Sequence, residues 1–164
     1  PQYQQALTLW PQFSHVIFTS QTSVHYWPLS LQNKIILAIG EATARAIQQR
    51  NATPLLAPAA TQEGVIALLK TLHPTFLFLP HSRRARPHLA HFLQQQNIHH
   101  FLLPLYDTHF QKPEPVPDLN AFDEIIFTSP STVEGFLRIY GHLPKDKKLT
   151  PIGPITMEAL SLSF

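Results

Sequence analysis

An internal repeat constrains the fold of this chain more than any other feature of its sequence. The segment 15–20 (HVIFTS) returns as the segment 124–129 (EIIFTS), 109 positions later, from Phe18 to Phe127. The segment 39–43 (IGEAT) returns as 152–156 (IGPIT), 113 positions later. Because the two matches keep their order along the chain, they predict two structurally related units.

Strands and helices are expected to alternate through the first unit. Runs of β-branched and aromatic residues predict five strands, at 16–19, 35–39, 54–58, 75–80 and 101–106. Apolar residues at helical spacing predict helices that begin after Gly40, Thr61 and Pro87, and Ala42, Ala46 and Ile47 are expected to share a buried face. Strands that alternate with helices indicate an α/β fold in which residues 1–106 form one doubly wound domain with a five-stranded parallel sheet.

Composition excludes several classes of protein. The chain has 164 residues, a hydrophobic share of 44%, a net charge of +2 and no cysteine. The absence of cysteine rules out a disulfide scaffold and a thiolate site, and adjacent His99 and His100 point apart, so no metal is expected. No apolar run approaches a membrane span of about 20 residues. The small charge argues against nucleic acid. The basic segment 82–86 is expected to be a solvated loop more than a binding site. His81 is expected in the loop after its strand, with a role in a site as the alternative. We expect a cytoplasmic protein without a membrane anchor.

The best domain boundary is a proline-rich connector. Pro113, Pro115 and Pro117 stand at every second position, which favours an extended, stiff segment. The predicted organisation is a complete α/β domain at 1–106, a connector at 107–117 and a partial second α/β domain at 118–164. The second repeat has no continuation like that of the first, and the chain begins without an initiator Met, so we expect a fragment. Its second domain should be marginally stable alone, because a sheet of few strands exposes an edge.

Four strand-to-helix turns are the candidate binding elements. Ser129 fits a helix N-cap followed by Pro130 at the first helical position, with Gly141 to end that helix. Ser20 stands at the matching place in the first unit, and Gly40 and Gly153 form the second matched pair. Such turns offer free N–H groups and the positive end of a helix dipole to anions, although plain capping explains any single turn. No phosphate-loop or dinucleotide motif is present, so nucleotide binding is not predicted.

Several ordered motifs resemble those of the uroporphyrinogen-III synthase family. They are the segments 39–44, 63–64, 79–80 with 85–87, 105–108, 126–133 and 152–156, and they span nearly the whole chain. The family usually carries a basic residue and glycine where this chain has His81 and Ser82. Its opening and closing strand–helix pairs have no counterpart here.

The resemblance implies two doubly wound, flavodoxin-like or HemD-like parallel-sheet domains that face a cleft. It also implies a cofactor-free reaction: hydroxymethylbilane loses water and cyclises, with inversion of the last pyrrole ring through a spiro intermediate, to give uroporphyrinogen III. The substrate carries eight carboxylates, which agrees with anion-binding turns. The expected full-length protein is a monomer that takes this small-molecule substrate. The alternatives are a non-catalytic, two-lobed binder of polycarboxylates, or an inactive fragment of the synthase.

The candidate site combines the turns with residues assigned through the resemblance. Tyr106 matches the family tyrosine next to the connector, proposed to donate a proton or hydrogen bond to the departing hydroxyl; a tyrosine simply packed at a strand end is the alternative. The expected substrate-binding residues are Thr19, Ser20, Gly40, Thr43, Arg86, Thr128, Ser129, Ser131, Thr132, Gly153 and Thr156.

Overall fold

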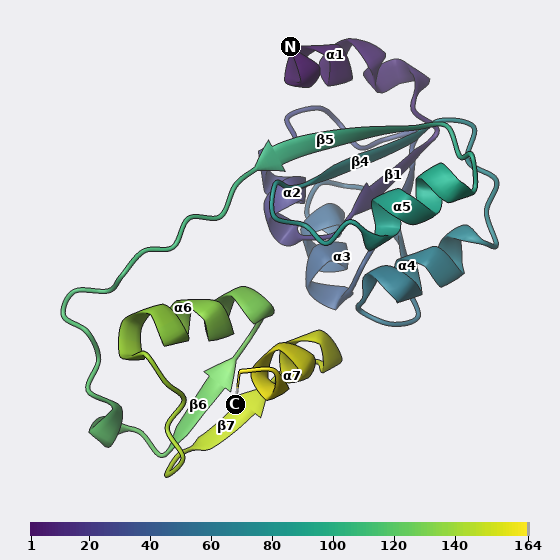
Figure 1. The fold of residues 1–164 in the computed structure, drawn as a ribbon. Coiled ribbons are helices and arrows are strands. Elements are labelled where there is room, and N and C mark those ends of the chain that lie inside the picture. The colour runs from purple at the N-terminus through teal and green to yellow at the C-terminus, as the bar shows by residue number, and fades with distance from the viewer. Residues whose placement is uncertain (164) are drawn as a thin grey trace. The chain divides into compact units, whose positions relative to one another are not determined.

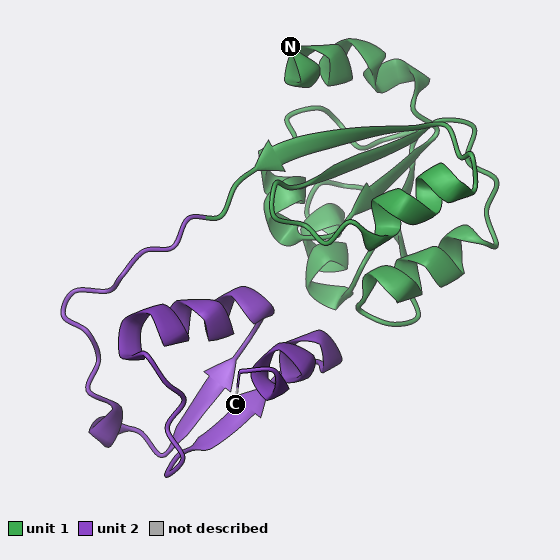
Figure 2. Ribbon diagram, in the orientation of Figure 1, with its two compact units in different colours: residues 1–108 green, residues 109–164 purple. Residues whose placement is uncertain are grey.

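The computed structural model describes residues 1–163, in which helices and strands alternate along the chain (Figure 1). The chain divides into two compact units, Pro1–Thr108 and His109–Phe164 (Figure 2). Residues 107–118 link the last strand of the first unit to the first helical turn of the second without a helix or strand of their own, and the Glu114–Pro115 bond is cis.

Unit 1 contains a five-stranded sheet in which every neighbouring pair is parallel, which confirms the predicted α/β class and sheet. Its strands are β1 (His15–Phe18), β2 (Ile35–Ala38), β3 (Pro54–Leu56), β4 (Leu77–Ser82) and β5 (His100–Tyr106). They lie in the order β3-β2-β1-β4-β5. This order belongs to Rossmann-type sheets, whereas the expected flavodoxin type would run 2-1-3-4-5.

Helices cover both faces of this sheet because successive strand residues point to opposite sides. Val16 and Phe18 of β1 pack into one buried cluster with residues of the first three helices, whereas Ile17 packs into a second cluster with residues of the last two. The helices are α1 (Gln2–Leu9), the 3-10 turn η1 (Trp10–Gln12), α2 (Gln21–Tyr26), α3 (Glu41–Gln48), α4 (Gln62–Leu69) and α5 (His88–Gln95).

The start of α4 depends on two residues of its first turn. Thr61 is the N-cap, as predicted, and its hydroxyl oxygen accepts a hydrogen bond from the Gly64 N–H at 3.1 Å. A Cβ added to Gly64 would lie 2.1 Å from the carbonyl oxygen of Ala59. Glycine is therefore required at this position by the close approach of a neighbouring loop rather than by its own backbone angles.

Three expectations about unit 1 need correction. Ala42 is exposed, and the buried face of α3 is formed by Thr43, Ala44 and Ile47. His81 lies in β4 rather than in a loop, because β4 continues past Pro80 in register with β5. Helix α1 is an additional element that the sequence pattern does not predict, although its Ala6 is fully buried in the core.

Unit 2 repeats the strand–helix order on a smaller scale. Its elements are the 3-10 turn η2 (Leu119–Ala121), β6 (Glu124–Phe127), α6 (Pro130–Tyr140), β7 (Lys148–Pro151) and α7 (Pro154–Ser161). The strands β6 and β7 form a parallel pair that starts with Glu124 opposite Lys148. Helix α6 ends at Gly141, whose φ of 78° is the left-handed conformation expected of a glycine C-cap.

The two faces of the β6–β7 pair differ in burial. One face packs against α6 and α7, with Phe127, Val133 and Leu160 in a small core. The other face is represented by Ile126, which lies between the inward-facing Ile125 and Phe127. The Ile126 side chain is 59% exposed. Unit 2 therefore buries only one side of its sheet.

Candidate functional site

The four predicted turns share one backbone geometry. Ser20, Gly40, Ser129 and Gly153 are the N-caps of α2, α3, α6 and α7, and their φ angles are −161°, −166°, −165° and −162°. Each cap stands two positions after the last residue of a strand, and parallel strands bring their carboxyl ends to the same edge of a sheet. Within each unit, the free N–H groups of its two turns therefore lie at one edge, where doubly wound folds bind ligands.

Hydroxyl groups tighten one turn in each unit in a similar way. In unit 1 the Ser23 hydroxyl donates to the Ser20 carbonyl at 2.8 Å. In unit 2 the matching Thr132 hydroxyl donates to the Ser129 carbonyl at 2.6 Å and accepts from the Ser129 N–H at 3.2 Å. The repeat thus preserves a side-chain clamp on the cap residue as well as its backbone conformation.

Tyr106 lies beside the first of these turns. The Tyr106 phenol oxygen is 2.8 Å from the Ser20 hydroxyl oxygen, although 86 positions separate the two residues. The Ser20 hydroxyl accepts from the Ser23 N–H at 3.1 Å and donates its single proton to the Ser23 hydroxyl oxygen at 3.1 Å. Either hydroxyl can donate in this contact, and as long as the Ser20 proton points to Ser23 the donor is the phenol of Tyr106. The structure therefore brings a predicted catalytic residue and a predicted binding residue together.

The other predicted residues differ in exposure. Thr19 and Gly153 are half-buried, and Thr128, Ser131 and Thr132 are exposed at the start of α6. Thr43 and Thr156, a matched pair, are each only 4% exposed. Their side chains pack inside the first turns of α3 and α7, so these two turns offer backbone N–H groups to a ligand rather than threonine hydroxyls.

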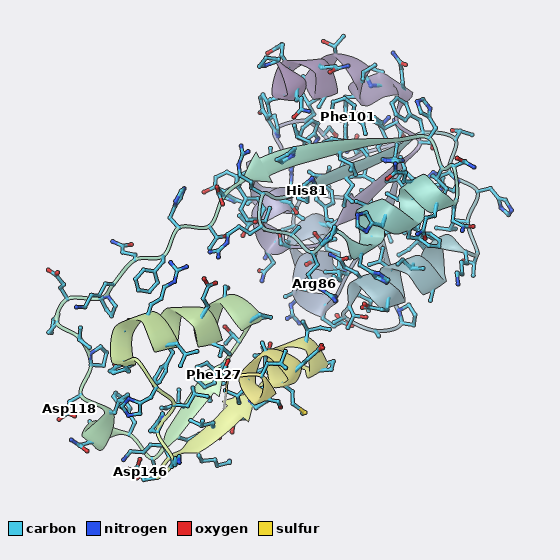
Figure 3. All side chains as sticks on the ribbon, viewed as in Figure 1. His81, Arg86, Phe101, Asp118, Phe127 and Asp146 are labelled. Carbon is cyan, nitrogen blue, oxygen red and sulfur yellow. The ribbon has the colours of Figure 1, made fainter. Side chains whose placement is uncertain are left out.

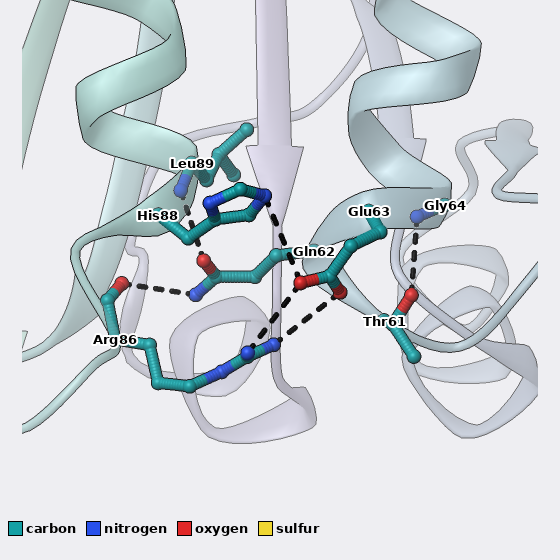
Figure 4. A network of polar contacts seen from close by, with 7 residues as sticks. All are labelled: Thr61, Gln62, Glu63, Gly64, Arg86, His88 and Leu89. Atoms are coloured by element: carbon teal, nitrogen blue, oxygen red, sulfur yellow. Dashed lines mark hydrogen bonds and ion pairs between the residues drawn. The ribbon is translucent and has the colours of Figure 1, made fainter. Parts of the chain in front are cut away.

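Arg86 belongs to a polar network that ties the loop before α5 to the start of α4 (Figure 4). Its guanidinium lies 3.4 Å from a carboxylate oxygen of Glu63, and the His88 ring lies 3.7 Å from the other oxygen. Gln62 is 9% exposed and uses both ends of its amide: the nitrogen donates to the Arg86 carbonyl at 3.0 Å, and the oxygen accepts from the Leu89 N–H at 2.9 Å. Gln62 thus holds the loop in place, a role that no sequence motif predicts.

The carboxylate in this network is ionised. A hydrogen bond from its own backbone and the nearby Arg86 hold the pKa of Glu63 below the ordinary glutamate value, against a smaller opposing effect of burial. At neutral pH Glu63 therefore neutralises part of the positive charge of Arg86. A ligand carboxylate would compete with Glu63 for this guanidinium.

Metal ligands do not gather anywhere in residues 1–163: no group of three or more His, Asp or Glu side chains is placed to hold an ion. None of the helices described is long and apolar enough to cross a membrane.

The fold and the turns define a doubly wound α/β protein whose strand-to-helix turns suit a small anionic ligand. A family model described as uroporphyrinogen-III synthase HemD matches residues 1–163, and the chain belongs to that family. The predicted family is thereby confirmed. No curated protein sequence matches the chain.

Solved structures agree with this assignment at the level of the fold. The crystal structure of a mutant uroporphyrinogen III synthase from the extremely thermophilic bacterium Thermus thermophilus is 19% identical, with a TM-score of 0.64 over 99% of this chain and 73% of that one. The uroporphyrinogen-III synthetase of Helicobacter pylori is 20% identical, with a TM-score of 0.60 over 92% of this chain and 73% of that one.

Proposed function

We propose that the chain acts in tetrapyrrole biosynthesis by cyclising hydroxymethylbilane to uroporphyrinogen III. In this reaction the terminal hydroxyl leaves as water, and the last pyrrole ring is inverted as the macrocycle closes. Membership of the synthase family supports the proposal. The structural observation that carries it is the set of four strand-to-helix turns with matched backbone geometry, two in each unit.

The turns are suited to the carboxylates of this substrate. A helix N-terminus presents unpaired N–H groups and a partial positive charge, so it binds anions without a large excess of basic residues. That agrees with a net charge of only +2. Helices α3, α6 and α7 have at least eight residues, whereas α2 has six, so the Ser20 turn is expected to bind a carboxylate less strongly than the other three turns. Each such charge-assisted hydrogen bond should contribute about 1.5–3 kcal/mol.

In this proposal Tyr106 assists the departure of the hydroxyl. A phenol can donate a proton or a hydrogen bond to the leaving oxygen, so that the C–O bond breaks with water as the product. When the phenol turns its proton to the substrate, the Ser20 hydroxyl can turn from Ser23 to the Tyr106 oxygen and donate there instead. The 2.8 Å contact between Ser20 and Tyr106 is what supports this exchange of partners.

Orientation is the other part of the proposed mechanism. The two ends of a linear tetrapyrrole must meet before the ring can close, and binding its carboxylates at several fixed turns favours such a folded conformation. Without an enzyme, ring closure gives the type I isomer, in which no pyrrole ring is inverted. The isomer formed therefore reports catalysis directly.

The decisive experiment feeds hydroxymethylbilane to the purified chain and separates the type I and type III porphyrins after oxidation. A type III fraction that grows in proportion to the amount of chain supports the proposal. Formation of type I alone contradicts it. If the chain then still binds the substrate by titration calorimetry, it is a polycarboxylate binder, and if it does not, it is an inactive fragment.

A further inference from the structure

The sheet of unit 1 has a switch point between β1 and β4. From β1 the chain proceeds through β2 to β3 on one side, and it then crosses to β4 and β5 on the other side. In doubly wound folds the crevice outside the carboxyl ends of the strands at such a point is the usual ligand site. A cavity of about 150 Å³ lies here, and its lining includes Thr19 after β1, His81 in β4 and Arg86 before α5.

The walls of this cavity are mostly apolar and well fixed. Leu79 and Leu89 are 4% and 1% exposed and pack in the core cluster beneath α4 and α5. The amide of Gln62 also lines the cavity, but both of its ends are bonded to the chain. An apolar cavity of about this volume can hold a single benzene-sized ring. The site therefore fits one five- or six-membered ring better than a peptide or a nucleotide.

His81 lines the cavity, and one of its two ring nitrogens is a hydrogen-bond acceptor. Its Nδ1 lies 2.8 Å from the Ser82 carbonyl oxygen, and a carbonyl can only accept, so Nδ1 carries the hydrogen. In the neutral ring Nε2 is then the atom with the free lone pair, and no residue that the structure describes is bonded to it. An aromatic ring that carries an N–H group would satisfy this acceptor.

Arg86 supplies the positive charge at the same cavity. Its side chain is 42% exposed, and its ion pair with Glu63 is long, at 3.4 Å. A ligand carboxylate can therefore reach the guanidinium without the removal of a buried partner. Figure 3 shows His81 and Arg86 in unit 1, and both lie on the stretch that runs from β4 into α5.

We propose that this cavity binds one pyrrole ring of an acyclic, carboxylate-bearing tetrapyrrole, with the ring N–H donated to His81 Nε2 and a side-chain carboxylate at Arg86. The inference rests on the proposed function for the identity of the ligand. The cavity and its two polar groups belong to unit 1 alone. No bond forms or breaks at this site, which holds one ring of the substrate in position.

The test compares two small probes that differ only in the N–H group. The 15N-labelled chain is titrated with pyrrole-3-carboxylate and with furan-3-carboxylate, and the backbone amide shifts are followed by NMR. Shifts are expected around the cavity, at residues 79–90, and the pyrrole should bind about fivefold more tightly, as one hydrogen bond allows. Equal affinities, or shifts confined to other parts of the chain, would overturn the proposal.

Four variants assign the contacts. His81→Phe should abolish the preference for pyrrole without changing the affinity for furan, whereas His81→Gln, which keeps an acceptor oxygen, should preserve the preference. Arg86→Gln should weaken both probes about threefold, as expected for an exposed ion pair. The neighbouring Arg84→Gln serves as the control, because Arg84 does not line the cavity, and should change neither affinity as much. A preference for pyrrole that persists in His81→Phe would contradict the assigned acceptor.

The result of this probe titration can be told apart from the result of the isomer assay that tests the proposed function. If the probes bind as expected but the chain produces only the type I isomer, the site stands and the proposed reaction falls. If type III product forms while the two probes bind equally, the reaction stands and this assignment of His81 is wrong.

Discussion

The matched strands β1 and β6 have nearly the same sequence but different surroundings. Phe18 and Phe127 occupy the same repeat position and are 0% and 2% exposed, whereas Ile17 and Ile126, one residue earlier, are 0% and 59% exposed. The N-cap turns that follow are almost identical in φ. Local sequence therefore determines the turn, while the number of neighbouring strands and covering helices determines how much of a strand is buried.

The largest expected difference between the units comes from these two isoleucines. Ile17→Ala removes a fully buried side chain from the central strand and should lower the free energy of unfolding by about 2–5 kcal/mol. Ile126→Ala should change it by less than about 1 kcal/mol, because most of that side chain is already in water. Urea unfolding followed by circular dichroism, with amide exchange to separate the units, measures both. Equal losses would show that the uncovered face of β6 is buried in solution.

The next largest effect is expected on catalysis, and it should differ between the two serine caps, Ser20 and Ser129. Tyr106→Phe should lower kcat about a hundredfold with little change in KM, because it removes only the donated proton. Ser20→Ala should also lower kcat, and the double variant should be no slower than Tyr106→Phe alone, since both act on one hydrogen bond. Ser129→Ala should raise KM instead. Initial rates of type III formation give these values, and an unchanged kcat in Tyr106→Phe would remove that residue from the mechanism.

A smaller effect is expected at the matched glycines. Both Gly40 and Gly153 have extended backbones that any residue can adopt, but a Cβ at Gly40 would lie 3.1 Å from the Ala60 Cβ, whereas nothing lies within 4 Å at Gly153. Gly40→Ala should therefore cost about 1 kcal/mol of stability and Gly153→Ala nearly nothing. Thermal unfolding of the two variants decides this. A larger loss for Gly153→Ala would mean that the second turn has a neighbour in solution.

The smallest expected effect is a difference in acid sensitivity. Burial lowers the pKa of His15 in β1 below its ordinary value of 6.5, so below that pH the unfolded chain binds more protons than folded unit 1. The stability of unit 1 should therefore decline as the pH falls through 6.5, and His15→Leu should remove this slope. At the matching position of β6, hydrogen bonds from Thr150 and Lys148 lower the pKa of Glu124 from 4.5, so the corresponding loss in unit 2 begins only below about pH 4.5.

Amide exchange measured for each unit from about pH 7 to about pH 4 tests this order of events. Loss of protection in unit 2 before unit 1 on acidification would contradict it.

The elements that the sequence predicts are those whose signals are local. The buried strands of unit 1 are runs of apolar residues, and the caps at Thr61 and Ser129 carry the side chains that caps require. Helix α1 lacks such signals, because only Ala6 of its eight residues is buried and it has no capping side chain. The loop prediction for His81 is wrong because a proline before it usually ends a strand, whereas here β4 runs on beside β5.

The candidate site is predictable only in part for a similar reason. Each turn can be found from its own residues, but the contact between Ser20 and Tyr106 joins positions 86 apart and depends on the strand order of the sheet. The role of Gln62 likewise depends on the approach of the loop before α5. No pattern within either segment contains that information.

The register of the strands has a consequence for the order in which the chain folds. In unit 1 the central pairing joins His15 to Leu77, whereas in unit 2 it joins Glu124 to Lys148. The first pairing closes a loop of 62 residues and the second a loop of 24, and the longer closure costs about 0.8 kcal/mol more in chain entropy. During refolding the β6–β7 pair should therefore form early and reversibly. The β1–β4 pair should be the slow step, and it commits the larger unit to its native topology.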